Sequence, residues 1–134
     1  MACASAPRVQ LDVRGRPQAR SLSCESRSAY DLLGHVGIQV DEATFLGGLA
    51  RSDNPEFGFV GSVDDPGGGL PPDGYGVYEG PIADRMRQLG CDVEAVRGVD
   101  LDWLRRHLDG GRPVIVWATA GLEPSPIVRM RDAR

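Results

Sequence analysis

Lysine is absent from this sequence of 134 residues, and all 15 basic residues are arginines. The arginines are scattered and the formal net charge is −4, so the chain lacks the basic patch by which proteins bind nucleic acid. Long apolar runs are also missing, since none approaches the roughly 18 residues that a membrane-spanning helix needs. We therefore expect neither a nucleic-acid partner nor a transmembrane segment, and we attribute the arginine bias to a high-GC genome.

Cysteine is scarce as well, with 3 residues in the chain. The cysteines, Cys3, Cys24 and Cys91, are odd in number, which argues against a disulfide framework. They also lack the spacing of metal ligands, which argues against a zinc site. We interpret Cys91, at the start of an apolar stretch, as a buried structural thiol. The glycine-rich residues 64–69 lack the lysine of a phosphate-binding loop and the alternating acids of a calcium loop. We expect no cofactor and no metal.

The length of the chain corresponds to one domain with a core of its own. Residues 1–7 are small and apolar but lack the basic start and long apolar stretch of a secretion signal. They fit either a disordered tail or the remnant of a signal whose beginning is lost. The location therefore stays open: extracytoplasmic in the second case, cytoplasmic otherwise. The patterned domain covers residues 8–120, and we expect an irregular tail at residues 121–134.

Apolar periodicity predicts both strands and helices. We expect strands at residues 8–13, 91–96 and 112–117. We expect helices at residues 24–33, 42–51, 81–89 and 101–108. The intervening residues 52–79 are rich in Gly, Pro and Asp, which predicts a long loop that is functional or poorly ordered. Together these elements predict an α+β fold.

Two aspartates precede expected helices and are suited to cap them, Asp41 before the second and Asp100 before the fourth. The fourth helix has an apolar face that we expect to point into the core. That face consists of Leu101, Leu104 and Leu108, with Trp103 beside them.

The most informative stretch places Cys24 at the start of the first helix. A helix N-terminus leaves backbone N–H groups unpaired and carries about half a positive charge, both of which favour a thiolate. Ser21 or Ser23 can supply the N-cap. Gln18, which precedes this cysteine, can help form an oxyanion hole, and the pair is typical of the nucleophile half of a papain-like site. The alternative is that Cys24 is a small buried residue.

A cysteine nucleophile needs a base, normally a histidine, within hydrogen-bond reach. His35 lies at the far end of the same helix, about 16 Å away at a rise of roughly 1.5 Å per residue. His107 lies within the fourth helix, where we expect a solvated side chain. Neither is a candidate base. Tyr75 and Tyr78 either line a substrate cleft or pack the long loop, and both interpretations stay open.

Two blocks of the sequence are fairly specific to a known protein family. They are Gly74-Tyr-Gly-Val-Tyr78 and Gly111-Arg-Pro-Val-Ile-Val-Trp117. The further matching segments are Leu11-Asp-Val13, Gln18, Ser23-Cys24-Glu25, Phe59-Val-Gly61, Asp65-Pro66, Pro72-Asp73 and Pro81-Ile82. In this order, from about residue 8 to residue 120, they resemble the peptidase C-39-like family, relatives of the bacteriocin-processing cysteine peptidases with a papain-like fold.

The resemblance implies roles for individual residues. Cys24 is the implied nucleophile and Gln18 the implied oxyanion-hole donor, while Glu25, Tyr75 and Tyr78 are candidates for the cleft. The thiolate is expected to attack an acyl carbon, commonly that of a peptide bond. Water then resolves the resulting acyl-enzyme.

The resemblance also implies an α+β, papain-like fold with two halves. A helical half carries the nucleophile, and an incomplete antiparallel sheet half begins at Arg112. The family places its general base in a later strand, in a segment resembling His-Ala-Val, but no histidine follows His107. We therefore expect a truncated chain or a short paralogue, with an exposed sheet edge.

These observations predict a bacterial-type cysteine peptidase or thiol hydrolase domain that acts on a peptide or protein and is impaired in this form. A partner or a missing segment would supply the general base. Two alternatives stay open: a non-catalytic peptide-binding module that uses the same cleft, and a non-functional gene fragment.

Overall fold

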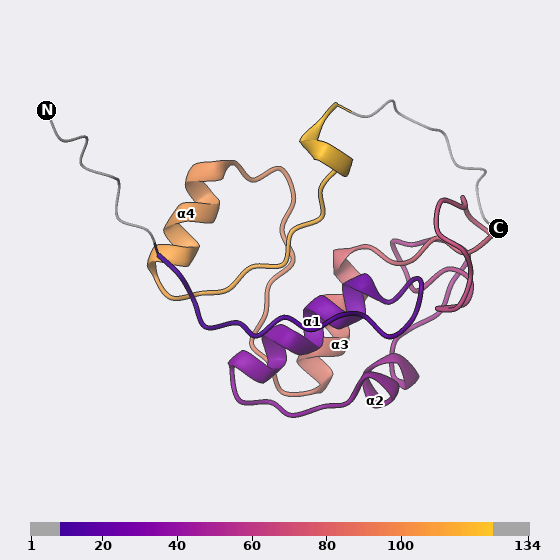
Figure 1. The fold of residues 1–134 in the computed structure, drawn as a ribbon, viewed down its shortest axis with the longest axis horizontal. Helices are drawn as coiled ribbons and strands as arrows, with labels where there is room; N and C mark the ends of the chain where they lie inside the picture. Colours follow the sequence, from indigo (N-terminus) through magenta and orange to yellow (C-terminus); the bar gives the residue numbers. More distant parts are fainter. Residues whose placement is uncertain (1–8, 125–134) are drawn as a thin grey trace, which may run out of the picture.

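The computed structural model describes residues 9–124. The expected tail at residues 1–7, with Cys3, lies outside the described residues, as do residues 125–134 of the expected C-terminal tail. Figure 1 shows a chain whose regular elements are all helices. They are α1 Cys24–His35, α2 Glu42–Gly47, α3 Glu79–Gln88, α4 Leu101–Asp109 and the short 3-10 helix η1 Ala120–Leu122.

The predicted helices are confirmed, although their ends differ from those expected. Asp41 caps α2, because its carboxylate accepts a hydrogen bond from the backbone N–H of Thr44 at 2.7 Å. Asp100 caps α4 in the same way through the N–H of Trp103 at 2.8 Å. The second helix is shorter than expected because it ends in two glycines, Gly47 and Gly48, which are poor helix formers.

The prediction of an α+β papain-like fold with an antiparallel sheet is wrong. Within residues 9–124 the chain forms no strand, and its ladder pairing is confined to two isolated bridges, Arg51 with Phe59 and Val60 with Gly76. The residues expected as strands, 9–13, 91–96 and 112–117, have no regular secondary structure.

The expected strands fail to form because each lacks a partner. The backbone N–H groups that begin or lie in these segments donate locally: Val13 to Leu11, Cys91 to Met86, and Arg112 to His107. A strand depends on hydrogen bonds to a neighbouring strand, so an apolar, β-branched sequence is insufficient to form one. The sheet half that Arg112 was expected to begin is therefore absent from the described chain.

The core lies where α1 meets α2, α3 and the long loop. α1 packs against both of these helices. Its inward side chains Ala29 and Leu33 are fully buried, as is Phe45 of α2. The loop at residues 52–79 contributes Phe59 and Val77 to the same cluster, so it is packed into the fold.

The fourth helix stands apart from the other three, at the upper left of Figure 1. The expectation that Leu101, Leu104 and Leu108 point into the core is wrong, because α4 has no buried residue and Leu101 is 68% exposed. An open cavity of about 1040 Å³ separates this helix from α3 and the extended segments around it. An apolar helix face is buried only when another element packs on it.

None of the helices in residues 9–124 combines the length and the apolar character required to cross a bilayer.

This arrangement predicts different costs for two matched truncations. Ile82 on α3 is 1% exposed, whereas Leu101 on α4 is 68% exposed. Ile82→Ala should lower the free energy of unfolding by about 2–5 kcal/mol, because it leaves a cavity in the core. Leu101→Ala should change it by less than about 0.5 kcal/mol. Urea unfolding followed by circular dichroism measures both. A Leu101→Ala loss as large as that of Ile82→Ala would show that α4 is packed in solution.

Candidate active site

The candidate nucleophile lies at the first residue of α1, where Cys24 is exposed. Ser23 occupies the N-cap position, as predicted, but its hydroxyl does not cap the helix. Its Oγ instead donates to the carbonyl of Arg20 and accepts from the N–H of Arg20, both at 3.2 Å. The serine therefore closes a tight turn in front of the helix.

Residues of the long loop hold this turn in place. The N–H of Leu22 donates to the carbonyl of Val63 at 2.9 Å. The hydroxyl of Ser21 donates to that carbonyl at 3.1 Å and to the carbonyl of Asp65 at 2.7 Å. The segment that leads into Cys24 is thereby fixed to residues 63–65.

The carboxylate of Asp65 organises the loop behind this contact. It accepts a hydrogen bond from the N–H of Ser62 at 2.7 Å. A Cβ atom at Gly74 would lie 2.3 Å from the Asp65 Cβ, so this position accommodates no side chain. The Asp65-Pro66 and Gly74 positions of the sequence blocks therefore have a structural role in the loop.

Glu25 joins the thiol to the loop on the other side. The Cys24 Sγ donates to Glu25 Oε2 at 3.1 Å, and Glu25 Oε1 accepts from the N–H of Val77 at 3.2 Å. Although Cys24 as a residue is exposed, its partial burial, and then the hydrogen bond to Glu25 and the negative charge of Glu25, raise the pKa of the Cys24 thiol to about 11. The N-terminus of a helix alone lowers a thiol pKa, so burial and the carboxylate outweigh it here.

Gln18 is exposed and points into its own turn. Its amide nitrogen donates to the carbonyls of Arg20 at 2.8 Å and Ser21 at 3.0 Å. These bonds stabilise the turn before α1. An oxyanion role for Gln18 stays a prediction, because in this arrangement its N–H groups are engaged by the backbone.

The two candidate cleft tyrosines lie beside Glu25 and bind each other. Their hydroxyl oxygens are 2.8 Å apart, and the rings of Tyr75 and Tyr78 meet edge to face. Burial, then the Tyr78 hydroxyl and the charge of Glu25, raise the pKa of Tyr75 to about 12. Both side chains are half-buried, so they pack the loop and also border the Cys24–Glu25 pair.

Trp117 is a site residue that the sequence did not single out. Its indole N–H donates to the carbonyl of Val77 at 3.1 Å, so Trp117 holds the carbonyl of the same residue whose N–H Glu25 holds. A signal was present, since this tryptophan ends the block that begins at Gly111. A sequence block does not reveal which backbone group its side chain binds.

Both histidines of the chain are bound elsewhere. The Nδ1 atom of His35 lies 2.8 Å from the carbonyl oxygen of Asp12, at the opposite end of α1. His107 lies 2.9 Å from the carbonyl of Trp103 and stacks on its ring, with the centroids 3.7 Å apart. The described residues therefore bring no histidine to Cys24.

Comparison with known proteins identifies the family. A family model described as the Peptidase_C39 like family matches residues 10–129. The chain belongs to this family. No curated protein and no solved structure gives a significant match. The resemblance inferred from the sequence blocks is thus confirmed, and the chain is a cysteine peptidase-like domain.

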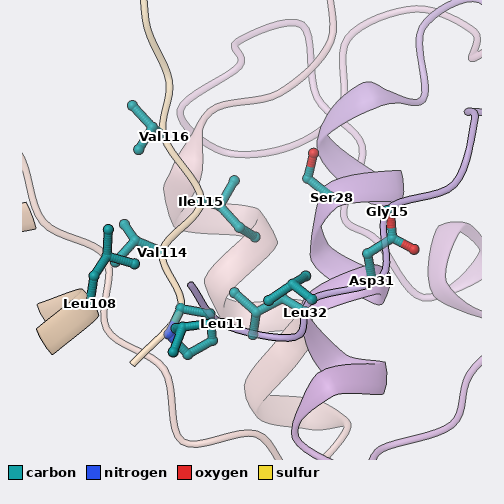
Figure 2. Close-up of a pocket in the computed structure, with 11 residues that line it drawn as sticks. Leu11, Gly15, Ser28, Asp31, Leu32, Leu108, Val114, Ile115 and Val116 are labelled. Atoms are coloured by element: carbon teal, nitrogen blue, oxygen red, sulfur yellow. The ribbon is translucent and has the colours of Figure 1, made fainter. Parts of the chain in front are cut away.

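This peptidase C39-like domain has an apolar crevice along α1, shown in Figure 2. The crevice has a volume of about 440 Å³ and lies between α1 and the extended residues 113–116. Ser28 and Leu32 line one wall, and Ile115 faces them in the figure. Ser28 lies one helical turn after Cys24 and donates to its carbonyl at 2.8 Å. Neither candidate tyrosine lines this crevice.

Across residues 9–124 of the domain, no group of three or more His, Cys, Asp or Glu side chains is arranged to hold a metal ion.

The position of Gly76 generates a prediction about the peptidase C39-like domain. Gly76 has a φ of +112°, and a Cβ there would lie 2.4 Å from Glu25 Oε1. Gly68 in the same loop has a φ of +89° with nothing within 4 Å of such a Cβ, so it is a matched control. Strain should cost each alanine variant about 1–3 kcal/mol. Gly76→Ala should lose about 1.5–3 kcal/mol more, because it breaks the hydrogen bond to the carboxylate.

Denaturant unfolding of the two variants measures the difference. Equal losses for Gly76→Ala and Gly68→Ala would show that the Glu25 carboxylate does not occupy this place in solution.

Proposed function

We propose that this domain is a cysteine hydrolase that acts on acyl groups of peptides or proteins, with Cys24 as its nucleophile. We further propose that it turns over slowly unless a partner chain or a further segment provides a general base. The observation that carries the proposal is an exposed thiol on the first residue of α1, beside a loop that Glu25 and Trp117 tie down.

The proposed reaction has two halves. The Cys24 sulfur gives up its proton and attacks the carbonyl carbon, and the C–N bond breaks as the amine takes up a proton. Water then attacks the thioester, which releases the acid and restores the thiol. Each half needs a group that carries a proton, and such a group contributes typically about 10²–10⁴ in rate. Since both histidines are bound away from Cys24, the isolated domain lacks this contribution.

The oxyanion that forms during the attack needs hydrogen-bond donors. The first N–H groups of a helix have no partner inside it, and those of α1 lie at the thiol. They are the first candidates for oxyanion donors. Gln18 is the second, and this role requires it to release the carbonyl of Arg20 or Ser21.

A comparison of two substrates tests this function. A p-nitrophenyl ester has a leaving group that needs no proton, so it should acylate Cys24 in a burst that mass spectrometry locates. A peptide amide should be cleaved about 10²–10⁴ times more slowly than by a peptidase with a positioned base. Cys24→Ala should abolish acylation, whereas Cys91→Ala, which removes a buried thiol, should retain it.

Two results would contradict the proposal. Acylation at an unchanged rate in Cys24→Ala would exclude this cysteine as the nucleophile. Amide cleavage at ordinary peptidase rates that depends on Cys24 would show that the isolated domain already contains a base.

A non-catalytic peptide-binding module is the second candidate function, and two observations favour it. The thiol pKa is raised, so little thiolate forms near neutral pH. The apolar crevice is walled by residues 113–116, which are extended and available to pair with an extended peptide.

If the domain binds a peptide in the apolar crevice, a charged side chain there should weaken the binding. Val116 lines it and is 59% exposed, whereas Leu70 lies in the long loop outside it and is 51% exposed. Val116→Asp should weaken binding of a labelled peptide of alternating Val and Thr by about tenfold or more, which corresponds to about 1.4 kcal/mol. Leu70→Asp should leave it unchanged. Fluorescence anisotropy measures both, and equal effects or no binding by the natural chain would exclude this function.

A further inference from the structure

Glu25 uses both carboxylate oxygens to connect the nucleophile with the loop. Oε2 accepts the hydrogen bond of the Cys24 thiol at 3.1 Å, while Oε1 accepts the N–H of Val77 at 3.2 Å. Ionisation of the thiol would remove the proton of the first bond and place a second negative charge against the carboxylate. A hydrogen bond to the neutral form and a neighbouring like charge both oppose ionisation.

The surroundings of Glu25 keep the carboxylate in this place. Gly76 leaves room for it, since a Cβ there would lie 2.4 Å from Oε1. The carbonyl of Val77, in the following peptide group, accepts a hydrogen bond from the indole N–H of Trp117 at 3.1 Å. The residue is also half-buried in the interface between α1 and the loop. Its contact with the thiol is therefore supported by residues on two segments outside α1, the long loop and the segment that ends at Trp117.

We propose that Glu25 is a positioning residue that locks the Cys24 side chain as a hydrogen-bonded thiol, and that its departure from Sγ primes the nucleophile. The inference concerns the regulation of the proposed active site, and it rests on the proposed function in so far as Cys24 is the nucleophile. When the carboxylate leaves, the S–H bond breaks heterolytically. The proton passes to a base in solution, and the electron pair stays on sulfur beside the N–H groups of the first turn.

The titratable groups that face this pair come from the loop. The Tyr75 hydroxyl is hydrogen-bonded to that of Tyr78, and the negative charge of Glu25 opposes ionisation of Tyr75. The pKa of Tyr75 is raised to about 12, so it stays neutral over the range in which the thiol is tested. The raised pKa of Cys24, caused by burial first and then by Glu25, agrees with the lock.

The pH dependence of Cys24 alkylation by iodoacetamide tests the lock on the full chain. Peptide-resolved mass spectrometry separates Cys24 from the other two cysteines, so no thiol needs to be replaced. The variant is Glu25→Gln, because a glutamine oxygen still accepts from Val77 while the charge is lost. Glu94→Gln is the control, since it removes the same charge from an exposed residue of the 91–96 segment.

In a scan from about pH 6 to 11, the alkylation rate of the natural chain should still be rising at the highest pH, because its thiol pKa is about 11. Glu25→Gln should lower the thiol pKa by about one unit or more, so that alkylation begins to level off within the scan. Its rate near neutral pH should rise about threefold, a smaller gain than the tenfold rise in thiolate because a less basic thiolate is also less nucleophilic. Glu94→Gln should match the natural chain. An unchanged pH profile in Glu25→Gln, or an equal shift in Glu94→Gln, would overturn the lock.

A second variant reaches the same contact without a change of charge. Gly76→Ala should displace the Glu25 carboxylate from the loop and shift the pH profile of Cys24 alkylation, in either direction, from that of the natural chain. A profile identical to the natural one would count against the coupling between Glu25 and the thiol. The ester assay separates the two proposals. A profile that depends on Glu25 without acylation of Cys24 upholds the lock and overturns the hydrolase, and acylation with a profile independent of Glu25 does the reverse.

Discussion

The backbone of Val77 connects the candidate site with the rest of the fold. Val77 is buried at 2% exposure, and both of its backbone polar groups are paired with side chains. Its N–H donates a hydrogen bond to the carboxylate of Glu25, which lies 52 residues earlier. Its carbonyl accepts a hydrogen bond from the indole of Trp117, which lies 40 residues later. A buried peptide group without partners costs free energy. The two side chains therefore stabilise the loop and fix the position of its residues Tyr75 and Tyr78 relative to α1.

The same loop shows how a segment without regular structure becomes part of a core. Phe59, Val60 and Val77 bury apolar side chains, and this burial offsets the conformational entropy lost on ordering the loop. The backbone bond from Val60 to Gly76 then closes the loop on itself at 2.9 Å. Because residues 63–65 also hold the turn before Cys24, the loop fixes the position of Cys24 from both sides.

The sequence predicted the helices because the signals for them are local. Periodicity and the caps at Asp41 and Asp100 lie within the helix that they specify. The sheet was not predictable in the same way, because pairing depends on a partner, and residues 112–117 are strand-like without one. The apolar face of α4 was expected to be buried and is not, for the same reason, since burial requires a second surface that packs on the first.

The candidate site divides along a similar line. Cys24 could be proposed as the nucleophile from the sequence, because a cysteine at a helix start and the motifs around it are sequence features. The roles of Glu25 and Trp117 were not, since each depends on a backbone group many residues away that only the folded chain brings near. His35 was set aside from helix geometry, and its ring lies at the far end of α1. His107 was expected to be solvated and is instead half-buried against the ring of Trp103, away from the thiol.

The protonation of the Cys24 thiol depends on opposing effects of different strength. The helix N-terminus favours the thiolate, whereas burial and the charge of Glu25 oppose it. A helix N-terminus at a surface is worth about 0.3–1 kcal/mol to a negative charge. Two like charges about 4 Å apart repel by about 4 kcal/mol at the effective dielectric typical near a protein surface, before further screening by solvent. Glu25 is nearer than that, with its carboxylate 3.1 Å from Sγ. Burial of the thiol and the neighbouring carboxylate therefore together outweigh the helix N-terminus, and α1 contributes the position of Cys24 more than a favourable charge.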